Sequence, residues 1–275
     1  MGRPRPTVHP VNAADLVDLD RYPVTDLDGP AGRAVVEHHR RELTEHGVSI
    51  LPGFVTEEGV RRLVAEADAL APVANFQDVH GTPYLGLPDD SYPPDHPRNA
   101  LSRSALSAIA YDLFPADSPL RALYEWDALL HLLSLLLDRA PLYRYADPLG
   151  ALNIAVMREG DELGWHFDQT DFVVSIALQS SLSGGDFANA ENLRTADDEH
   201  YDDVTAVLTG QAPERIATVP MTPGTLMLFA GRCSLHAVTP VVGPVPRYVA
   251  LLAYDTKPDT NSSELLKLVR YGRAA

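Results

Sequence analysis

The chain changes character near residue 142, and this change limits the folds that it can adopt. Short β-type runs follow that point, at 152–157, 172–179, 215–219, 225–229 and 248–254. Turn signals such as Ser183-Gly-Gly-Asp186 and Thr222-Pro-Gly224 punctuate them. Segment 197–208 interrupts the series with a helical pattern. Strands of this length predict a β-sandwich or barrel.

Helical patterns dominate before residue 142. We expect helices over 32–45 and 118–138, with Ser118 as the N-cap of the second. Another helix should begin after Thr56, because a capping residue precedes an apolar pattern of helical spacing there. A short strand is expected over 48–51. Helices first and strands second predict one α+β domain over the whole chain.

Two irregular segments accompany these elements. Residues 1–30 are rich in Pro, Asp and Gly and predict an irregular N-terminal arm. Residues 76–99 contain several prolines and predict a long loop. Long loops in compact domains are often functional, so a lid over a binding site is one hypothesis for this segment.

The charge of the chain restricts its partners. The net charge is -16, from 38 acidic and 22 basic residues. An acidic surface repels phosphate backbones and anionic lipid, so we expect a small-molecule partner and neither nucleic acid nor membrane. The single cysteine, Cys233, excludes an intrachain disulfide, and no apolar run approaches the length of a membrane span. We therefore expect a cytoplasmic protein.

The segment Gly164-Trp-His166-Phe-Asp168 carries the most informative pattern. Residues i and i+2 of a strand point to the same side, so His166 and Asp168 can share one face. His236 follows the predicted strand 225–229 and is the expected third ligand. Two histidines and one carboxylate leave metal positions open, as non-haem iron(II) oxygenases require. We predict an iron(II) site at these three residues.

Arg247 opens the strand that follows His236. Its guanidinium can bind a carboxylate through two parallel hydrogen bonds and stays charged when buried. We interpret Arg247 as the anchor for the distal carboxylate of 2-oxoglutarate. The competing interpretation is an arginine in a surface ion pair at the edge of a strand.

These segments resemble the iron(II)/2-oxoglutarate-dependent dioxygenases. The resemblance covers residues 47–255 and includes the entry pattern 46–54, Gly184-Gly-Asp-Phe187 and Pro223-Gly-Thr-Leu226, besides the three ligands and Arg247. Within that family, segments 89–98, 158–168 and 236–240 look most similar to free amino-acid halogenases and their hydroxylase and aziridine-forming relatives.

The resemblance implies a double-stranded β-helix core (a jelly-roll, cupin-like barrel) over 142–255, flanked by N-terminal helices. It also implies iron(II), 2-oxoglutarate and O2 as cofactor and co-substrates. Halogenases of the group carry a small residue at the position of Asp168, so the carboxylate here favours hydroxylation. Many relatives have Ser where this chain has Val249, so the co-substrate needs another contact; the candidates are Thr225, Thr239 and Asn153.

Group resemblance suggests a free amino acid or a close derivative as substrate. Its carboxylate would need a cation, for which the candidates are Arg98 and Arg103. Its ammonium group would need an acceptor, for which the candidates are Gln169, Asp171 and Asp147. Trp165 is the candidate for a wall of the cavity, and Asn153 begins a strand that would line it.

Three other functions stay open. The same metal site could support desaturation, cyclisation or aziridine formation in place of hydroxylation. A non-catalytic barrel could bind a small ligand and use the His-Asp pair as a hydrogen bond in its core. A hydrolase could use Asp168 and His236 as an acid–base pair, but no Gly-x-Ser-x-Gly nucleophile motif is present.

Overall fold

An eleven-stranded antiparallel sheet organises the computed structural model, which describes residues 11–274. Its strand order is β1-β11-β7-β14-β5-β3-β6-β12-β9-β10, and β2 pairs with the other edge of β3. The strands are β1 (Val48–Leu51), β2 (Asn75–Gly81), β3 (Ser102–Ile109), β5 (Leu152–Met157), β6 (Glu162–His166), β7 (Val173–Gln179), β9 (Phe187–Ala190), β10 (Ile216–Val219), β11 (Leu226–Phe229), β12 (Leu235–Val238) and β14 (Arg247–Leu252). Two small sheets pair β4 (Tyr143–Arg144) with β15 (Tyr254–Asp255), and β8 (Ser183–Gly184) with β13 (Val241–Val242).

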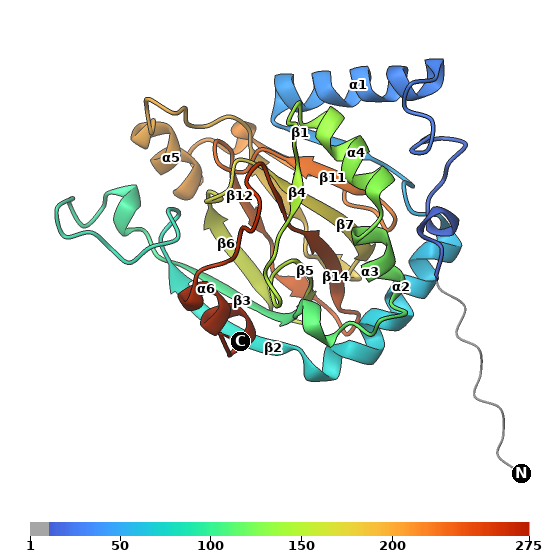
Figure 1. Cartoon of the computed structure of the whole chain (residues 1–275). Helices are drawn as coiled ribbons and strands as arrows, with labels where there is room; N and C mark the ends of the chain where they lie inside the picture. The colour runs from blue at the N-terminus through green and yellow to red at the C-terminus, as the bar shows by residue number, and fades with distance from the viewer. Residues whose placement is uncertain (1–10, 275) are drawn as a thin grey trace, which may run out of the picture.

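The main sheet curls so that its two halves face each other (Figure 1). One half contains β1, β11, β7, β14 and β5, and the other contains β6, β12, β9 and β10. Phe229 of the first half meets Phe187 and His236 of the second, with ring centroids 5.2 and 4.7 Å apart. Inward side chains of both halves therefore share one interior, as the predicted jelly-roll core requires.

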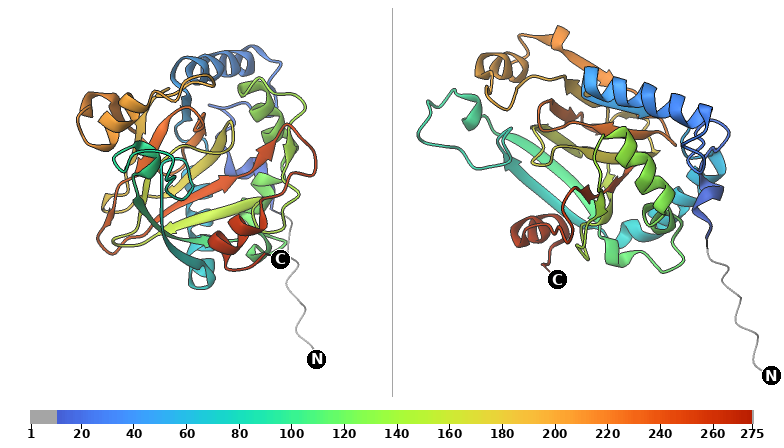
Figure 2. Two further views of the ribbon diagram at one scale, coloured as in Figure 1. Left: turned by 90° about the vertical axis from the view of Figure 1, so that its left-hand side faces the viewer. Right: turned by 45° about the horizontal axis from the view of Figure 1, so that its top comes forward.

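The N-terminal helices cover the outer face of the first half-sheet. On β14, Tyr248 and Ala250 pack against the core under the helices. Arg247 and Val249, which alternate with them along the strand, therefore point to the interior between the half-sheets. Figure 2 shows α1 and α4 side by side above the strands. The helices are α1 (Pro30–His46), α2 (Glu57–Leu70), α3 (Pro119–Tyr124), α4 (Asp127–Leu136), α5 (Tyr201–Leu208) and α6 (Glu264–Tyr271), with 3-10 turns at Ala13–Leu16, Ala71–Val73, Pro97–Asn99, Tyr111–Leu113 and Pro213–Arg215.

Several local predictions are confirmed. Thr56 caps α2, because its side chain accepts a hydrogen bond from the Gly59 N–H. Ser118 caps α3 in the same way by accepting from Arg121 N–H. The five β-runs expected after residue 142 all form strands, with boundaries within two residues of those expected. The helical insertion is shorter than expected and begins at Tyr201.

The single helix predicted over 118–138 is wrong, because α3 ends at Tyr124 and α4 begins at Asp127. Trp126 between them is extended, with φ -73° and ψ 117°. The Tyr124 carbonyl accepts a hydrogen bond from the side chain of Arg144 at 2.9 Å. That bond satisfies the carbonyl outside a helix, so tertiary contacts override the helical pattern at this point.

The prediction of a loop over 76–99 is wrong for its first part, which forms β2 and pairs with β3. The β-core consequently draws on β1, β2 and β3 and does not begin at residue 142. Residues 82–101 form the loop that projects to the left in Figure 1. Strand β2 was missed because it lies at the edge of the sheet and most of its side chains are exposed, which leaves no alternating apolar pattern.

The predicted N-terminal arm is irregular but not loose over the part that the structure describes. Residues 1–10 lie outside the described residues. Beyond them, Leu16, Tyr22 and Leu27 are buried in the main core, and the Tyr22 hydroxyl donates to the Pro52 carbonyl at 2.9 Å. Irregular backbone can therefore pack as firmly as a helix when its side chains are apolar.

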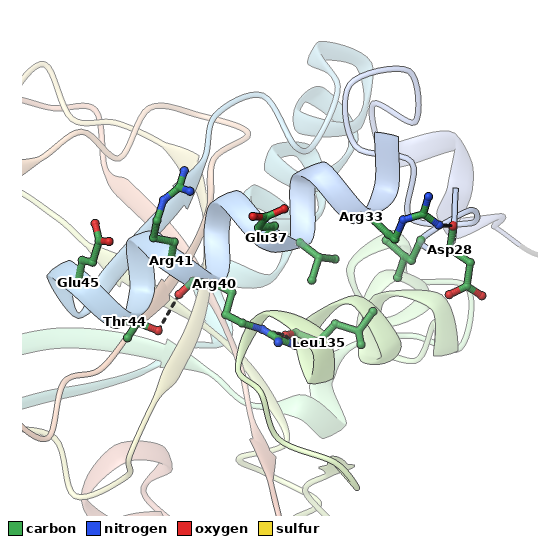
Figure 3. Close-up of a pocket in the computed structure, with 10 residues that line it drawn as sticks. Asp28, Arg33, Glu37, Arg40, Arg41, Thr44, Glu45 and Leu135 are labelled. Atoms are coloured by element: carbon green, nitrogen blue, oxygen red, sulfur yellow. Dashed lines mark hydrogen bonds between the residues drawn. The ribbon is translucent and has the colours of Figure 1, made fainter. Parts of the chain in front are cut away.

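The helical side carries a surface hollow that is separate from the barrel interior. Figure 3 shows its charged rim, which includes Arg33, Glu37 and Arg41 of α1, with Leu135 of α4 below. None of the candidate site residues lines this hollow. No helix within residues 11–274 combines the length and apolar character needed to cross a membrane.

His39 should make the fold sensitive to mild acid. It is buried on α1 and bonds Ser49 at 2.9 Å, and burial, with a smaller effect of His38, lowers its pKa to about 4. In the unfolded chain His39 binds a proton near pH 6.5, so the free energy of unfolding decreases as the pH falls from 6.5 towards 4.

We expect the wild type to lose about 2–3 kcal/mol more of its free energy of unfolding between pH 7 and 4.5 than His39→Gln does, measured by denaturant unfolding. His38→Gln, at the exposed neighbouring position, should keep most of the wild-type pH dependence, because burial is the larger cause of the shift; equal slopes for wild type and His39→Gln would contradict the argument.

Candidate metal centre

Two neighbouring strands bring the candidate histidines together. His166 ends β6, and His236 lies directly opposite it on β12. Residues opposite each other in an antiparallel pair point to the same face. Their ring centroids are 4.1 Å apart, and both side chains are buried in the interior between the half-sheets. The sheet register therefore places both imidazoles at one point.

Asp168 completes the cluster from the segment that follows β6. Its N–H donates to the Gly231 carbonyl at 3.0 Å, which fixes the turn. Its Oδ1 lies 3.8 Å from His166 Nε2, and its Oδ2 lies 3.6 Å from His236 Nε2. One potential ligand atom from each residue falls within 4.8 Å of the others.

Backbone carbonyls set the tautomer of each histidine. His166 Nδ1–H donates to Gly164 O at 2.8 Å, and His236 Nδ1–H donates to Ser234 O at 3.0 Å. A carbonyl only accepts, so Nδ1 carries the proton and the Nε2 lone pair faces the cluster. Burial, with a smaller effect of His166, holds the pKa of His236 well below its usual range, so that ring is neutral at pH 7.

No hydrogen bond joins the Asp168 carboxylate to either histidine, so the three side chains do not stabilise one another without a cation. Asp168 Oδ2 is buried and has no hydrogen-bond partner. Both Asp–His distances are too long for hydrogen bonds, which counts against a simple His-Asp bond in the core. Burial raises the pKa of Asp168, whereas electrostatic interactions with His166 and Arg270 lower it by less. Two imidazole nitrogens and one carboxylate that converge in this way fit iron(II).

Gly231 allows the carboxylate to take its position. A Cβ at residue 231 would lie 1.7 Å from Asp168 Oδ2 and 2.9 Å from Phe229 Cε1. We expect Gly231→Ala to displace the carboxylate and weaken iron(II) binding by roughly 10- to 100-fold, as disturbed ligand orientation does in other metal sites. Anaerobic calorimetric titration measures this. Gly86→Ala is the matched control, because nothing lies within 4 Å of a Cβ there; equal affinities for both variants would refute the role of Gly231.

Arg247 is a buried cation without a protein anion. Its only side-chain hydrogen bond runs to Met157 Sδ at 3.7 Å, and no carboxylate of residues 11–274 is within ion-pairing distance. Burial lowers the pKa of Arg247 to about 10, so it stays charged at neutral pH. Gly185, at φ +67°, passes so close that a Cβ would lie 2.9 Å from Arg247 Cδ. The Gly184-Gly185 turn thus leaves room for the guanidinium.

The other cofactor candidates lie at different places in the barrel. Asn153 is buried and opposes Leu251, on the inward face. Thr225 is fully buried, and its carbonyl accepts from Ala177, the residue that opposes Val249. The Thr239 hydroxyl already accepts from the Asp186 N–H at 2.9 Å. The Thr225 hydroxyl lies 3.1 Å from the Thr222 hydroxyl, so both threonines already have protein partners, and their roles as co-substrate contacts stay predictions.

The structure does not support three of the substrate candidates. Trp165 precedes His166 on β6, so it points to the opposite face, where it packs against the apolar cluster beside α5. Gln169 is exposed, and its carbonyl accepts from Arg232. Asp171 is exposed and pairs with Arg232 at 2.7 Å. Adjacency to Asp168 in sequence misled the prediction, because the chain turns outward after the ligand.

Protein groups already bind the remaining substrate candidates. Arg98 donates to the Tyr201 hydroxyl at 2.7 Å and pairs with Glu199. Arg103 pairs with Asp78 at 2.9 Å and Glu162 at 3.3 Å. Asp147 is buried, pairs with Lys267 and accepts from Leu149 and Ser262 N–H groups. These contacts explain the three residues as structural ion pairs.

The sequence reasoning missed three polar residues that the fold brings to the interior. Ser175 and Asn189 are buried on β7 and β9, and Ser175 Oγ and Asn189 Oδ1 have no hydrogen-bond partner. Arg270 reaches inward from α6, where its Nη2 donates to Asn153 Oδ1 at 3.4 Å. Polar residues within strands of alternating pattern were the available signal for the first two. No local pattern marks Arg270.

Comparison with known proteins identifies the family. A sequence model described as halogenase D (HalD) matches residues 97–267, more than half of the chain. The chain therefore belongs to this family. No curated protein sequence matches it.

Solved structures share this fold at low sequence identity. The non-haem α-ketoglutarate-dependent epimerase SnoN from nogalamycin biosynthesis has a TM-score of 0.55 at 14% identity, covering 81% of this chain and 83% of that one. The carbocyclase SnoK from the same biosynthesis has a TM-score of 0.54 at 16% identity, covering 90% and 86%. AviO1 from Streptomyces viridochromogenes Tue57 has a TM-score of 0.53 at 17% identity, covering 84% and 97%. The fold predicted from the sequence resemblance is confirmed.

Proposed function

We propose that the protein is an iron(II)- and 2-oxoglutarate-dependent oxygenase that hydroxylates an unactivated C–H bond of a free amino acid or similar small metabolite. The observation that carries the proposal is the buried, unpartnered Asp168 carboxylate facing the Nε2 atoms of His166 and His236. Bound iron(II) and 2-oxoglutarate would supply the oxidising chemistry with O2. The protein would supply the ligands, the anchor for the co-substrate and the position of the substrate.

Asp168 favours hydroxylation over halogenation within this family. A carboxylate in the third ligand position leaves no room there for a halide, in contrast to the small residue that the amino-acid halogenases carry. A carboxylate also offsets part of the charge of iron(II). Family membership by itself therefore does not imply halogenation here.

Arg247 would hold the distal carboxylate of 2-oxoglutarate. Its guanidinium is buried, charged and without a carboxylate partner among the described residues, so a bound dicarboxylate would satisfy it. Val249 on the same inward face adds no hydrogen-bond donor, and Thr225 is the proposed second contact. The loop of residues 82–101 touches the site through Pro83, whose carbonyl accepts from Phe167 N–H, and this contact keeps the lid hypothesis open.

Succinate release across a panel of free amino acids tests the proposal, with iron(II), 2-oxoglutarate and air present and product masses read from the same samples. We expect one amino acid to stimulate succinate release and to gain one oxygen. Loss of two hydrogens would point to desaturation, cyclisation or aziridine formation. Absence of iron(II) and 2-oxoglutarate binding would overturn the proposal in favour of a non-catalytic barrel.

A further inference from the structure

The C-terminal helix α6 buries its charged side and exposes its apolar side. Lys267 is buried and Arg270 half-buried, whereas Leu265, Leu266, Leu268 and Val269 are exposed. The helix packs against β2 and β3, in front of the barrel in Figure 1. Burial of a cation is far less favourable than burial of leucine, so each inward cation needs an anionic or polar partner. Lys267 has one, because its Nζ lies 3.3 Å from Asp147 Oδ1.

Arg270 has no such partner. Its Nη2 donates to Asn153 Oδ1 at a long 3.4 Å, and its Nε is buried without a hydrogen-bond acceptor. No carboxylate of residues 11–274 comes within ion-pairing distance, although the chain has 38 acidic residues. The Asn75 side chain donates to the Arg270 carbonyl at 3.2 Å and holds this turn of α6 in place. The turn of α6 is therefore held in place, and the guanidinium points inward with a buried N–H that has no acceptor.

The register of the sheet directs Arg270 into the same barrel interior as the metal centre. Its partner Asn153 opposes Leu251, and Leu251 opposes Ser175, so Asn153 and Ser175 lie in one inward row of the first half-sheet. Asn189 opposes His236, which opposes His166, in one row of the second half-sheet. Three unsatisfied groups, Arg270 Nε, Ser175 Oγ and Asn189 Oδ1, thus face the interior that holds the ligand cluster.

Arg270 and Arg247 are placed to bind different carboxylates. Arg247 opposes Met157 on β5, whereas Arg270 contacts Asn153, four residues away along that strand. Four residues of extended chain span about 13 Å. With Arg247 assigned to 2-oxoglutarate, Arg270 is available to a second anion.

We infer that Arg270 is the anchor for the carboxylate of the substrate in this enzyme. The inference rests on the proposed function and defines its substrate class, which is a small zwitterion whose carboxylate binds the Arg270 guanidinium. Asn189 Oδ1 is an acceptor suited to the ammonium group, and Ser175 Oγ can either donate or accept. An arginine beside Asn153 binds a planar carboxylate through two hydrogen bonds, which a single lysine cannot do.

Anaerobic calorimetry with the protein loaded with iron(II) and 2-oxoglutarate tests the inference. The probes are the free amino acids of the activity panel and their carboxamides. We expect the wild type to bind its best amino acid about 100-fold more tightly than the corresponding carboxamide, since a charged bidentate contact is lost. Arg270→Gln should lose this preference and bind the amino acid about 100-fold more weakly, with Arg270→Lys between the two.

Arg273→Gln is the matched control, because Arg273 lies three residues further on and pairs with Asp112 on the surface. It should bind the amino acid as the wild type does. The affinity of Arg270→Gln for 2-oxoglutarate should stay within about twofold of wild type, because Arg247 remains. Weaker binding of 2-oxoglutarate alone would assign Arg270 to the co-substrate and overturn the inference. Unchanged amino-acid binding, or no binding of any amino acid by a wild type that binds 2-oxoglutarate, would also overturn it while leaving the oxygenase proposal intact.

Discussion

In halide-free buffer, where no halide can take the vacated ligand position, replacing Asp168 with alanine is expected to weaken iron(II) binding by more than roughly 100-fold and to abolish 2-oxoglutarate turnover, since even indirect supports of a metal site contribute 10- to 100-fold. The carboxylate is the only anionic group among the three proposed ligands, so its loss removes both a ligand atom and the charge that offsets the cation. The two imidazoles that remain would bind a divalent ion weakly.

The same substitution should have the opposite effect on the protein without metal. Asp168 Oδ2 is buried without a hydrogen-bond partner, and an uncompensated buried charge destabilises the fold. Asp168→Ala should therefore match or exceed the wild type in melting temperature without iron(II), yet gain no stability when iron(II) is added. A purely structural Asp168 would give a lower melting temperature in both conditions.

Thermal unfolding with and without iron(II), together with anaerobic calorimetric titration, measures both effects. Asp171→Asn is the matched control, because it removes a carboxylate three residues further along that pairs with Arg232 on the surface. Its iron(II) affinity should equal that of the wild type. Equal iron(II) affinities for Asp168→Ala and Asp171→Asn would remove Asp168 from the metal site.

The identity of the three ligands was predictable from sequence, because Asp168 lies two residues from His166 and His236 follows a clear strand pattern. Strand β6 ends at His166, however, so the bond from Asp168 N–H to the Gly231 carbonyl positions the carboxylate, and strand alternation does not. What the pattern could not supply is the register that sets His236 opposite His166, or the close approach of Gly231 to Asp168. Both depend on pairing between strands that are far apart in sequence.

The substrate side was less predictable for the same physical reason. Gln169 and Asp171 adjoin a ligand in sequence, but the chain turns outward after Asp168 and leaves both exposed. Arg270 lies far from every motif and reaches the centre only because α6 packs across β2 and β3. Its helix also breaks the usual rule that the apolar face is buried, so periodicity would orient it wrongly.

Replacing Arg247 with methionine should weaken 2-oxoglutarate binding by about 100-fold or more, because two hydrogen bonds to a carboxylate are lost. Met keeps much of the volume of the side chain beside Met157 and Gly185, so the barrel should still pack. Arg247→Lys keeps the charge without the planar fork and should fall between methionine and the wild type.

Melting temperatures measured without and with 2-oxoglutarate distinguish a co-substrate anchor from a purely structural role for Arg247. Arg247 is buried, charged and without a carboxylate partner among residues 11–274, so Arg247→Met should not lower the melting temperature of the protein without ligand. The wild type should gain stability as 2-oxoglutarate is added with iron(II), whereas the methionine variant should gain almost none at the same concentrations. Arg215→Met, which removes a surface pair with Asp203, should respond to 2-oxoglutarate as the wild type does. If Arg247→Met unfolds at a lower temperature but still gains the full stabilisation by 2-oxoglutarate, the guanidinium supports the barrel and the co-substrate is held elsewhere.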